Sequence, residues 1–193
     1  MSEAAAQAPH PVGRTGMLWL MVSDAFSFAA LFFAFAWSRN YAVGFHDAAE
    51  PKVSAGWGAA LTGVLVLSSV AMGLATRYAQ REKWRLSAWA TGVTAFSGAL
   101  FIAMQLEEYF GLAGILFGLH REGLRLGQSA FANLFYALTA FHGLHVLSCV
   151  VLTGVASVGL LRQKFSADTL SVIGPWVQFV DGVWLFIFGA VYF

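Results

Sequence analysis

Two histidines lie within the longest stretch of the chain that has no charged residue. His142 and His145 fall in the segment 129–161, which contains no Asp, Glu, Lys or Arg. Residues three apart share one face of a helix, and Thr139 lies one turn earlier on the same face. An ionisable side chain inside a membrane-spanning helix is costly, so it usually has a partner and a function. This stripe is suited to hydrogen bonding, proton transfer or metal binding.

Polar pairs at the same spacing occur in other hydrophobic segments. We expect a helix bundle to turn them inward, so that acids, amides and imidazoles form one hydrogen-bonded network. Such a network can simply fix helix packing, and replacing His142 by leucine would then leave its partners unpaired. These further residues are Ser23, Asp24 and Ser27, then Gln105 and Glu108, and finally Gln178 and Asp181.

Asp24 is the most informative of these residues. It lies about ten residues into the first hydrophobic segment, among Val22, Phe26 and Phe28. A carboxyl group at that depth is a candidate for handling protons, and a static hydrogen bond to a neighbouring helix is the alternative.

The spacing of the histidines argues against a metal or haem site. Two histidines three apart sit at nearly the same depth and cannot hold both faces of a haem. A di-iron bundle needs Glu-x-x-His motifs, and neither Glu107 nor Glu108 has a histidine three residues later. The single cysteine, Cys149, allows no disulfide and no thiolate cluster. We therefore expect no metal in this chain and a merely structural Cys149.

The elements that must position these groups are membrane-spanning helices. Of the 193 residues, 59% are hydrophobic and 11% are charged, whereas soluble domains carry roughly 25% charged residues. The formal net charge of +1 provides no basic cluster for a nucleic acid. The composition predicts an integral membrane protein of the all-α class.

Five segments are long and apolar enough to span a bilayer. The segment 111–127 is too short in its apolar part to cross and predicts an interfacial piece. Residues 1–14 are predicted to be a flexible cytoplasmic tail, and residues 15–193 a five-helix domain. The predicted spans are 15–37, 55–76, 86–110, 128–161 and 171–193.

The basic residues of the connections predict the orientation in the membrane. The connection between the second and third spans carries a charge of +3, which predicts a cytoplasmic location. The N-terminus near Arg14 and the loop with Arg162 and Lys164 then fall on the same side, and the C-terminus lies outside. The residues of the connection are Arg77, Arg81, Lys83 and Arg85, against Glu82.

Small residues repeat every four positions in two of the spans, which predicts close contacts between helices. The repeats are Ala59 with Gly63, Ala88 with Gly92, and Ala95 with Ala99 and Ala103.

Several motifs in this order resemble one family, subunit III of the haem–copper oxidases. Residues 139–146 are similar to its signature Thr-Gly-Phe-His-Gly-Leu-His-Val, with Ala140 replacing the first glycine. Gln105, Glu108 and Tyr109 resemble its Gln-x-x-Glu-Tyr. Residues 179–186 resemble its closing Phe-Val-Asp-x-Val-Trp-Leu-Phe, 16–37 its Phe-rich helix, and 68–69 its Ser-Ser. The resemblance covers residues 16–193.

The resemblance implies an auxiliary subunit of the five-helix bacterial type, without redox centres or catalytic residues. Haem and copper would belong to the partner subunits I and II. The chain would pack against subunit I, bind phospholipid and support proton uptake. It would do so as part of a hetero-oligomer in the bacterial cytoplasmic membrane.

Some positions depart from the family pattern. Asp24 stands where the family has an intramembrane glutamate, and Gln178 where it has a histidine before Phe-Val-Asp. The resemblance begins at the third of the family's seven helices, so we do not expect the family's lipid-filled cleft within this chain. Arg162 resembles an arginine that contacts a lipid phosphate, and an ordinary snorkelling arginine is the alternative.

The sequence leaves the complex open. A subunit III-like partner of a quinol oxidase or nitric oxide reductase is the main alternative to a cytochrome c oxidase subunit, because the electron donor binds elsewhere. A free-standing proton channel would need a continuous polar path through one chain, which we do not expect.

Overall fold

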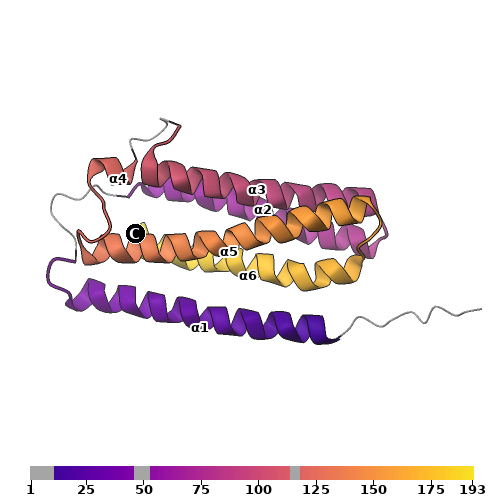
Figure 1. The fold of residues 1–193 in the computed structure, drawn as a ribbon, viewed down its shortest axis with the longest axis horizontal. Helices are drawn as coiled ribbons and strands as arrows, with labels where there is room; N and C mark the ends of the chain where they lie inside the picture. Colours follow the sequence, from indigo (N-terminus) through magenta and orange to yellow (C-terminus); the bar gives the residue numbers. More distant parts are fainter. Residues whose placement is uncertain (1–10, 46–52, 114–117) are drawn as a thin grey trace, which may run out of the picture.

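Five long helices run side by side in this computed structural model, which describes residues 11–45, 53–113 and 118–193 (Figure 1). All five are long and apolar enough to cross a membrane, and the described residues include no β-strand. The predicted all-α architecture with five spans is therefore confirmed. The helices are α1 (Pro11–Tyr41), α2 (Ala55–Gln80), α3 (Trp84–Phe110), the short α4 (Leu119–Glu122), α5 (Ala130–Leu161) and α6 (Ala167–Val191).

Local signals fix where the helices begin and end. Ser54 and Ser129 cap α2 and α5, because their hydroxyl groups accept hydrogen bonds from backbone N–H groups three residues later. Gly111 ends α3 with a left-handed backbone (φ 61°), a conformation that favours glycine. α1 begins at Pro11, inside the segment expected to be a tail. Residues 1–10 lie outside the described part, and the tail remains a prediction.

The segment 111–127 forms no sixth span in its described residues. It carries the four-residue helix α4 at one end of the bundle, which we call the α4 end (Figure 1). Residues 114–117, in the middle of its apolar stretch, lie outside the described residues, and the interfacial placement remains a prediction.

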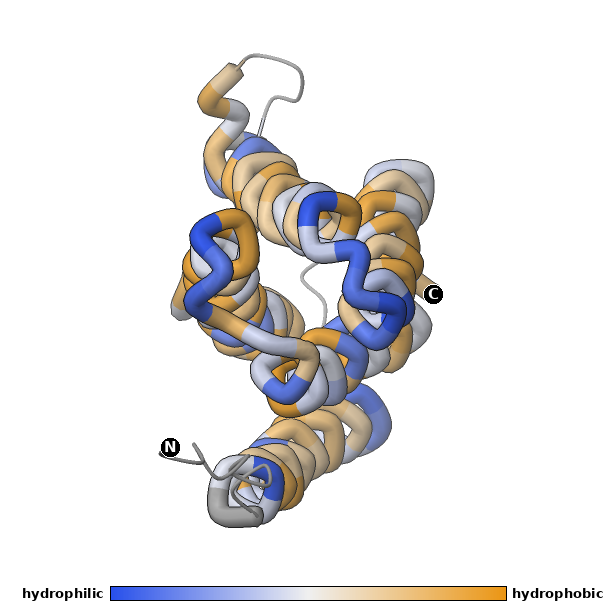
Figure 2. Tube along the Cα trace, turned by 90° about the vertical axis from the view of Figure 1, so that its right-hand side faces the viewer, coloured by the Kyte–Doolittle hydropathy of each residue, from blue (hydrophilic) through white to orange (hydrophobic). Residues whose placement is uncertain are grey.

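Helices α2, α3, α5 and α6 form the main body, and α1 lies along its outside (Figure 2). In the most hydrophobic window of α1 only 11% of residues are buried, against 50% for α6. Among the helices α1 touches α5 and α6 alone. Its buried Phe28 and Phe35 pack on Phe141 and Phe131 of α5.

One of the three small-residue repeats brings helices together. Ala88 is buried in α3, and the hydroxyl of Ser157 in α5 donates to its carbonyl at 2.8 Å. A Cβ at Gly92 would lie 3.3 Å from that same hydroxyl oxygen. In the other repeats Ala59, Gly63, Ala99 and Ala103 are exposed, so within the described part of the chain they face outward.

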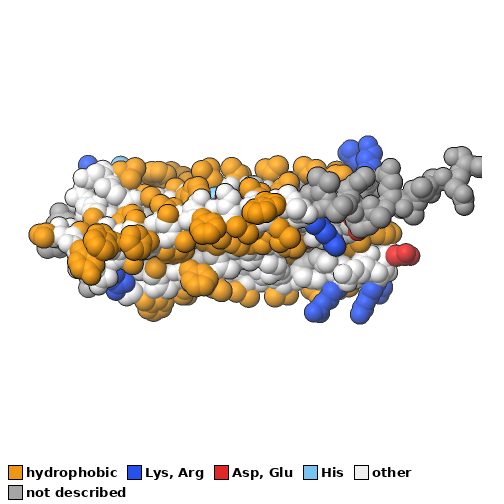
Figure 3. All heavy atoms as spheres, turned by 90° about the horizontal axis from the view of Figure 1, so that it is seen from below, with side chains coloured by type: hydrophobic (Ala, Val, Ile, Leu, Met, Phe, Trp, Pro, Cys, Tyr) orange, Lys and Arg blue, Asp and Glu red, His pale blue; other side chains and the backbone are white. Residues whose placement is uncertain are grey.

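Charge is concentrated at the ends of the bundle. On the face seen in Figure 3, hydrophobic side chains cover the length between two ends that carry Lys and Arg. We call the end where α1 begins the basic end, because seven of the eleven Lys and Arg residues belong to it. These are Arg14, Arg77, Arg81, Lys83, Arg85, Arg162 and Lys164.

Candidate functional site

The predicted intramembrane polar residues form separate groups rather than one network. Three groups join different helices, and we call them the α1–α5 pair, the α3–α6 cluster and the α2–α6 cluster. The α1–α5 pair is Asp24 with His145. The α3–α6 cluster is Gln105 and Glu108 with Tyr192. The α2–α6 cluster is Gln178 and Asp181 with Ser69.

The α1–α5 pair lies near the middle of both helices. The Nε2 atom of His145 is 3.4 Å from Oδ2 of Asp24, and the two side chains are 13% and 16% exposed. At this depth the side chain of Asp24 therefore makes a polar contact between the peripheral α1 and the main body. Ser23 and Ser27 do not join it: both are exposed, and the Ser27 hydroxyl donates to the Ser23 carbonyl within α1.

The other nitrogen of the His145 ring determines what the pair can do. Nδ1 lies 2.7 Å from the Phe141 carbonyl oxygen, and because a carbonyl only accepts, a hydrogen bond there places a proton on Nδ1. Nε2 then faces the Asp24 carboxyl group across 3.4 Å. The pair is thus a polar contact held in a fixed orientation between two helices.

Aromatic rings surround this pair on the protein side. The rings of Phe28, Phe141 and Trp176 have centroids 5.2, 4.6 and 5.8 Å from that of His145. The Trp176 indole donates to the Ser148 hydroxyl at 3.0 Å, and that hydroxyl donates to the His145 carbonyl at 2.6 Å. These contacts hold the α5 backbone and the imidazole in place.

His142 differs from His145 although both lie on one face of α5. Its side chain is 0% exposed, and neither ring nitrogen has a hydrogen-bond partner among the described residues. It packs between the rings of Phe28, Phe101 and Trp184, with the Trp184 centroid at 5.4 Å. The structure therefore places His142 in an aromatic core and outside the three polar groups.

The α3–α6 cluster lies at the α4 end. Oε2 of Glu108 accepts hydrogen bonds from the Gln105 amide and from the Tyr192 hydroxyl, both at 2.7 Å. Next to it, the Tyr109 hydroxyl donates to Thr139, which in turn donates to the Phe135 carbonyl. The predicted Gln105, Glu108 and Thr139 thus tie α3 to α6 and α5 in the part of the bundle toward the α4 end.

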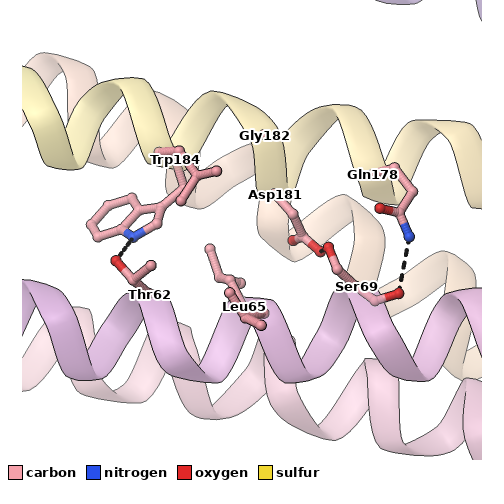
Figure 4. Close-up of a pocket in the computed structure, with 9 residues that line it drawn as sticks. Thr62, Leu65, Ser69, Gln178, Asp181, Gly182 and Trp184 are labelled. Atoms are coloured by element: carbon pink, nitrogen blue, oxygen red, sulfur yellow. Dashed lines mark hydrogen bonds between the residues drawn. The ribbon is translucent and has the colours of Figure 1, made fainter.

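The α2–α6 cluster lies at mid-span along the seam of these two helices (Figure 4). The Ser69 hydroxyl donates to Oδ2 of Asp181 at 2.6 Å, and the exposed Gln178 donates from its amide to the Ser69 carbonyl at 3.0 Å. One turn further along, the Trp184 indole donates to the Thr62 hydroxyl at 3.0 Å. Ser69, Thr62 and Tyr192 were not among the predicted site residues, although Ser69 belongs to the Ser-Ser motif at 68–69.

Large apolar side chains separate the polar groups from one another. The buried Phe28, Phe101 and Trp184 fill the space around His142, between the α1–α5 pair and the other two groups. The hydrogen bonds of the described residues form no continuous polar path along the bundle, as a free-standing channel would require.

The described residues hold no group of three or more His, Cys, Asp and Glu side chains that would suit a metal ion. Cys149 is buried and unpaired. The location of haem and copper in other subunits remains a prediction.

Two arginines lie where lipid headgroups are expected. Arg162 caps the C-terminus of α5 at the basic end, and its side chain is exposed. Arg39 lies toward the α4 end on the rim of a groove of about 700 Å³ between α1 and α6, and donates to the Ala190 carbonyl at 3.4 Å. Phe32, Phe35, Phe186 and small residues line this groove.

Comparison with curated proteins reveals relatives that align with nearly the whole chain. A probable cytochrome c oxidase subunit 3 from Nocardia farcinica is 29% identical, over 98% of this chain and 94% of its own length. A cytochrome c oxidase subunit 3 from Corynebacterium diphtheriae is 27% identical, over 98% and 91%. A probable quinol oxidase subunit 3 from Staphylococcus aureus is 28% identical, over 68% and 64%. No protein-family model matches the chain.

Proposed function

We propose that this chain, a homologue of haem–copper oxidase subunit III, is an auxiliary subunit of a respiratory terminal oxidase in a bacterial cytoplasmic membrane. The resemblance seen in the motifs is confirmed by relatives named as oxidase third subunits that cover most of the chain. In this proposal, subunits I and II carry the haem and copper. The observation that carries it is the similarity over 98% of the chain, together with five helices of membrane-spanning type.

Cytochrome c is the electron donor of the complex that we favour. The relatives named for cytochrome c oxidase align with 98% of the chain, whereas the relative named for quinol oxidase aligns with 68%. A quinol oxidase subunit is the second candidate, because that shorter match has a similar identity of 28%.

We further propose that Asp24 and His145 support proton uptake by the complex. The supporting observation is the geometry of the pair, in which a carboxyl group and an imidazole face one another at mid-span and are 16% and 13% exposed. A carboxyl one methylene shorter than the family's glutamate can fill this role here because the imidazole lies within 3.4 Å. The chain's own contribution is to store and release a proton, and no electron passes through it.

The proposed lipid ligands are phospholipids at the two arginines. A guanidinium group at the membrane boundary pairs with a phosphate, and an adjoining apolar groove accommodates an acyl chain. Arg39 has such a groove beside it, between α1 and α6. Arg162 contributes the charge at the basic end.

Purification of the native complex tests the proposed function. The chain is tagged in its own organism, solubilised in mild detergent and purified, and the copurifying proteins are identified by mass spectrometry. We expect subunits I and II in equal amounts and a reduced-minus-oxidised haem spectrum. Activity with reduced cytochrome c or with quinol distinguishes the two oxidases. Recovery of the chain alone, or with proteins that bind no haem, would refute the proposal.

A further inference from the structure

A shallow groove runs along the membrane face of the bundle between α2 and α6. Its volume is about 170 Å³, and the α2–α6 cluster forms part of its floor (Figure 4). One stripe of each helix borders it, with residues spaced four and three apart. The stripes are Thr62, Val66 and Ser69 on α2, and Gln178, Gly182 and Leu185 on α6.

This groove lies at the depth where lipid offers no hydrogen bonds. Ser69 and Gln178 are each within two residues of the middle of their helices, so both lie within about 3 Å of mid-span at 1.5 Å per residue. Polar groups at that depth face protein or a water-filled space, since hydrocarbon leaves them unsatisfied.

Gln178 has hydrogen-bonding capacity that the chain does not use. Asp181 beneath it is buried and accepts from Ser69. Gln178 is exposed, and its amide donates one hydrogen bond, to the Ser69 carbonyl. A glutamine amide has a second N–H and an accepting oxygen, and among the described residues nothing else bonds to either. A donor or acceptor from outside the chain would satisfy the remaining hydrogen-bonding groups of the Gln178 amide.

Glycines leave the two stripes open to a close neighbour. Gly182 lies in the groove, and Gly73 and Gly189 continue the stripes by one further turn. A Cβ at any of the three would meet nothing within 4 Å outside its own helix turn. Small residues of this kind allow two helix backbones to approach closely in a membrane. A lipid acyl chain in this groove would not require the close approach that glycines allow, and it could not form a hydrogen bond with the Gln178 amide.

We propose that the α2–α6 groove receives a transmembrane helix of a partner oxidase subunit, with a hydroxyl or amide side chain that hydrogen-bonds to Gln178. This inference rests on the proposed function, because it requires an oxidase complex, and it adds which face of the chain docks and by what chemistry. The partner helix should present small residues to the glycines and one Ser, Thr, Asn or Gln at mid-span.

Site-specific photo-crosslinking in the intact complex tests the assignment. Benzoylphenylalanine replaces Leu185 on the rim of the groove, and as a matched control it replaces Leu144, which is exposed on α5. We expect the probe at residue 185 to crosslink to another oxidase subunit and the probe at residue 144 to give lipid adducts. Adducts of residue 185 with lipid only, or with a second copy of this chain, would overturn the proposal.

Substitutions provide an independent measurement if the probe disturbs assembly. Gln178→Leu should lower retention of the chain during a detergent wash about threefold to tenfold, the range for one interhelical hydrogen bond in a membrane. Gln178→Asn should restore part of it. Gly182→Leu should release the chain, whereas Gly143→Leu, at an equally open glycine of α5, should not. Equal retention of all variants would refute the docking site.

The two failures can be told apart. If the wild-type chain copurifies with no oxidase, the proposed function fails. If it copurifies normally while residue 185 reports lipid and Gln178→Leu is retained like wild type, only the groove assignment fails.

Discussion

A carboxyl group and an imidazole that face one another inside a membrane form a polar unit between two helices. In this chain the unit is Asp24 with His145, and the bond from His145 Nδ1 to the Phe141 carbonyl directs the other ring nitrogen at the acid. Losing His145 leaves the Asp24 carboxyl group without this contact at mid-span, which is costly there. The pair therefore contributes to the attachment of α1 to α5.

Asp24→Ala tests the proton role at this scale. We expect the complex to assemble with normal stoichiometry but to lose activity severalfold faster during continuous turnover, because a proton-holding group is gone. Stopped-flow proton uptake and the time course of oxygen consumption measure this. Ser27→Ala is the matched control, since that hydroxyl bonds only to its own helix. Identical inactivation of Asp24→Ala and wild type would argue for a structural role alone.

His142 leads to a different prediction from the one that its sequence position suggested. Since its ring nitrogens have no hydrogen-bond partner among the described residues, His142→Phe should leave the melting temperature of the complex unchanged or raise it. His142→Ala should instead destabilise by about 2–4 kcal/mol through the cavity it leaves. A large loss with phenylalanine would show that the imidazole has a polar partner in another subunit.

At the scale of helices, spacing rules predicted which residues share a face but not which face is buried. The five spans were predictable from their apolar length, and their predicted ends lie within four residues of those in the structure. The polar pairs were predictable as candidates, yet their partners were not, because Ser69, Thr62 and Tyr192 come from helices that only the tertiary packing brings close. The same limit applies to the repeat with Ala99 and Ala103, which faces outward: spacing defines a stripe on a helix but not the neighbour that the stripe meets.

The contact of α3 with α5 should be sensitive to added bulk at Gly98. A Cβ at Gly98 would lie 2.7 Å from Cγ2 of Val150, whereas one at Gly154 meets nothing within 4 Å. Gly98→Val should therefore destabilise the chain by about 1–3 kcal/mol, and Gly154→Val should be tolerated. Thermal melts of the purified complex compare the two. Equal melting temperatures would mean that the backbones separate at little cost.

At the scale of the whole molecule, charge predicts the orientation in the membrane. Seven of the eleven Lys and Arg residues belong to the basic end, which by the positive-inside rule should face the cytoplasm. Single cysteines at Arg81 and at Leu126, treated with a membrane-impermeant maleimide on intact cells, test this. We expect labelling at residue 126 and none at residue 81 until the cells are opened. The native Cys149 is buried and should not react with the maleimide. The opposite labelling pattern would show that the protein has the reverse orientation in the membrane.

The loose attachment of α1 has a consequence for biosynthesis. Asp24 is made 121 residues before His145, and at the usual speed of a ribosome this delay amounts to roughly 6–24 seconds. Throughout that interval the nascent first helix sits in the translocon or the bilayer with its acid unmatched. We therefore expect its insertion to be the step most dependent on an insertase, and cells that lack one to accumulate chains whose last four helices are integrated while the first is not.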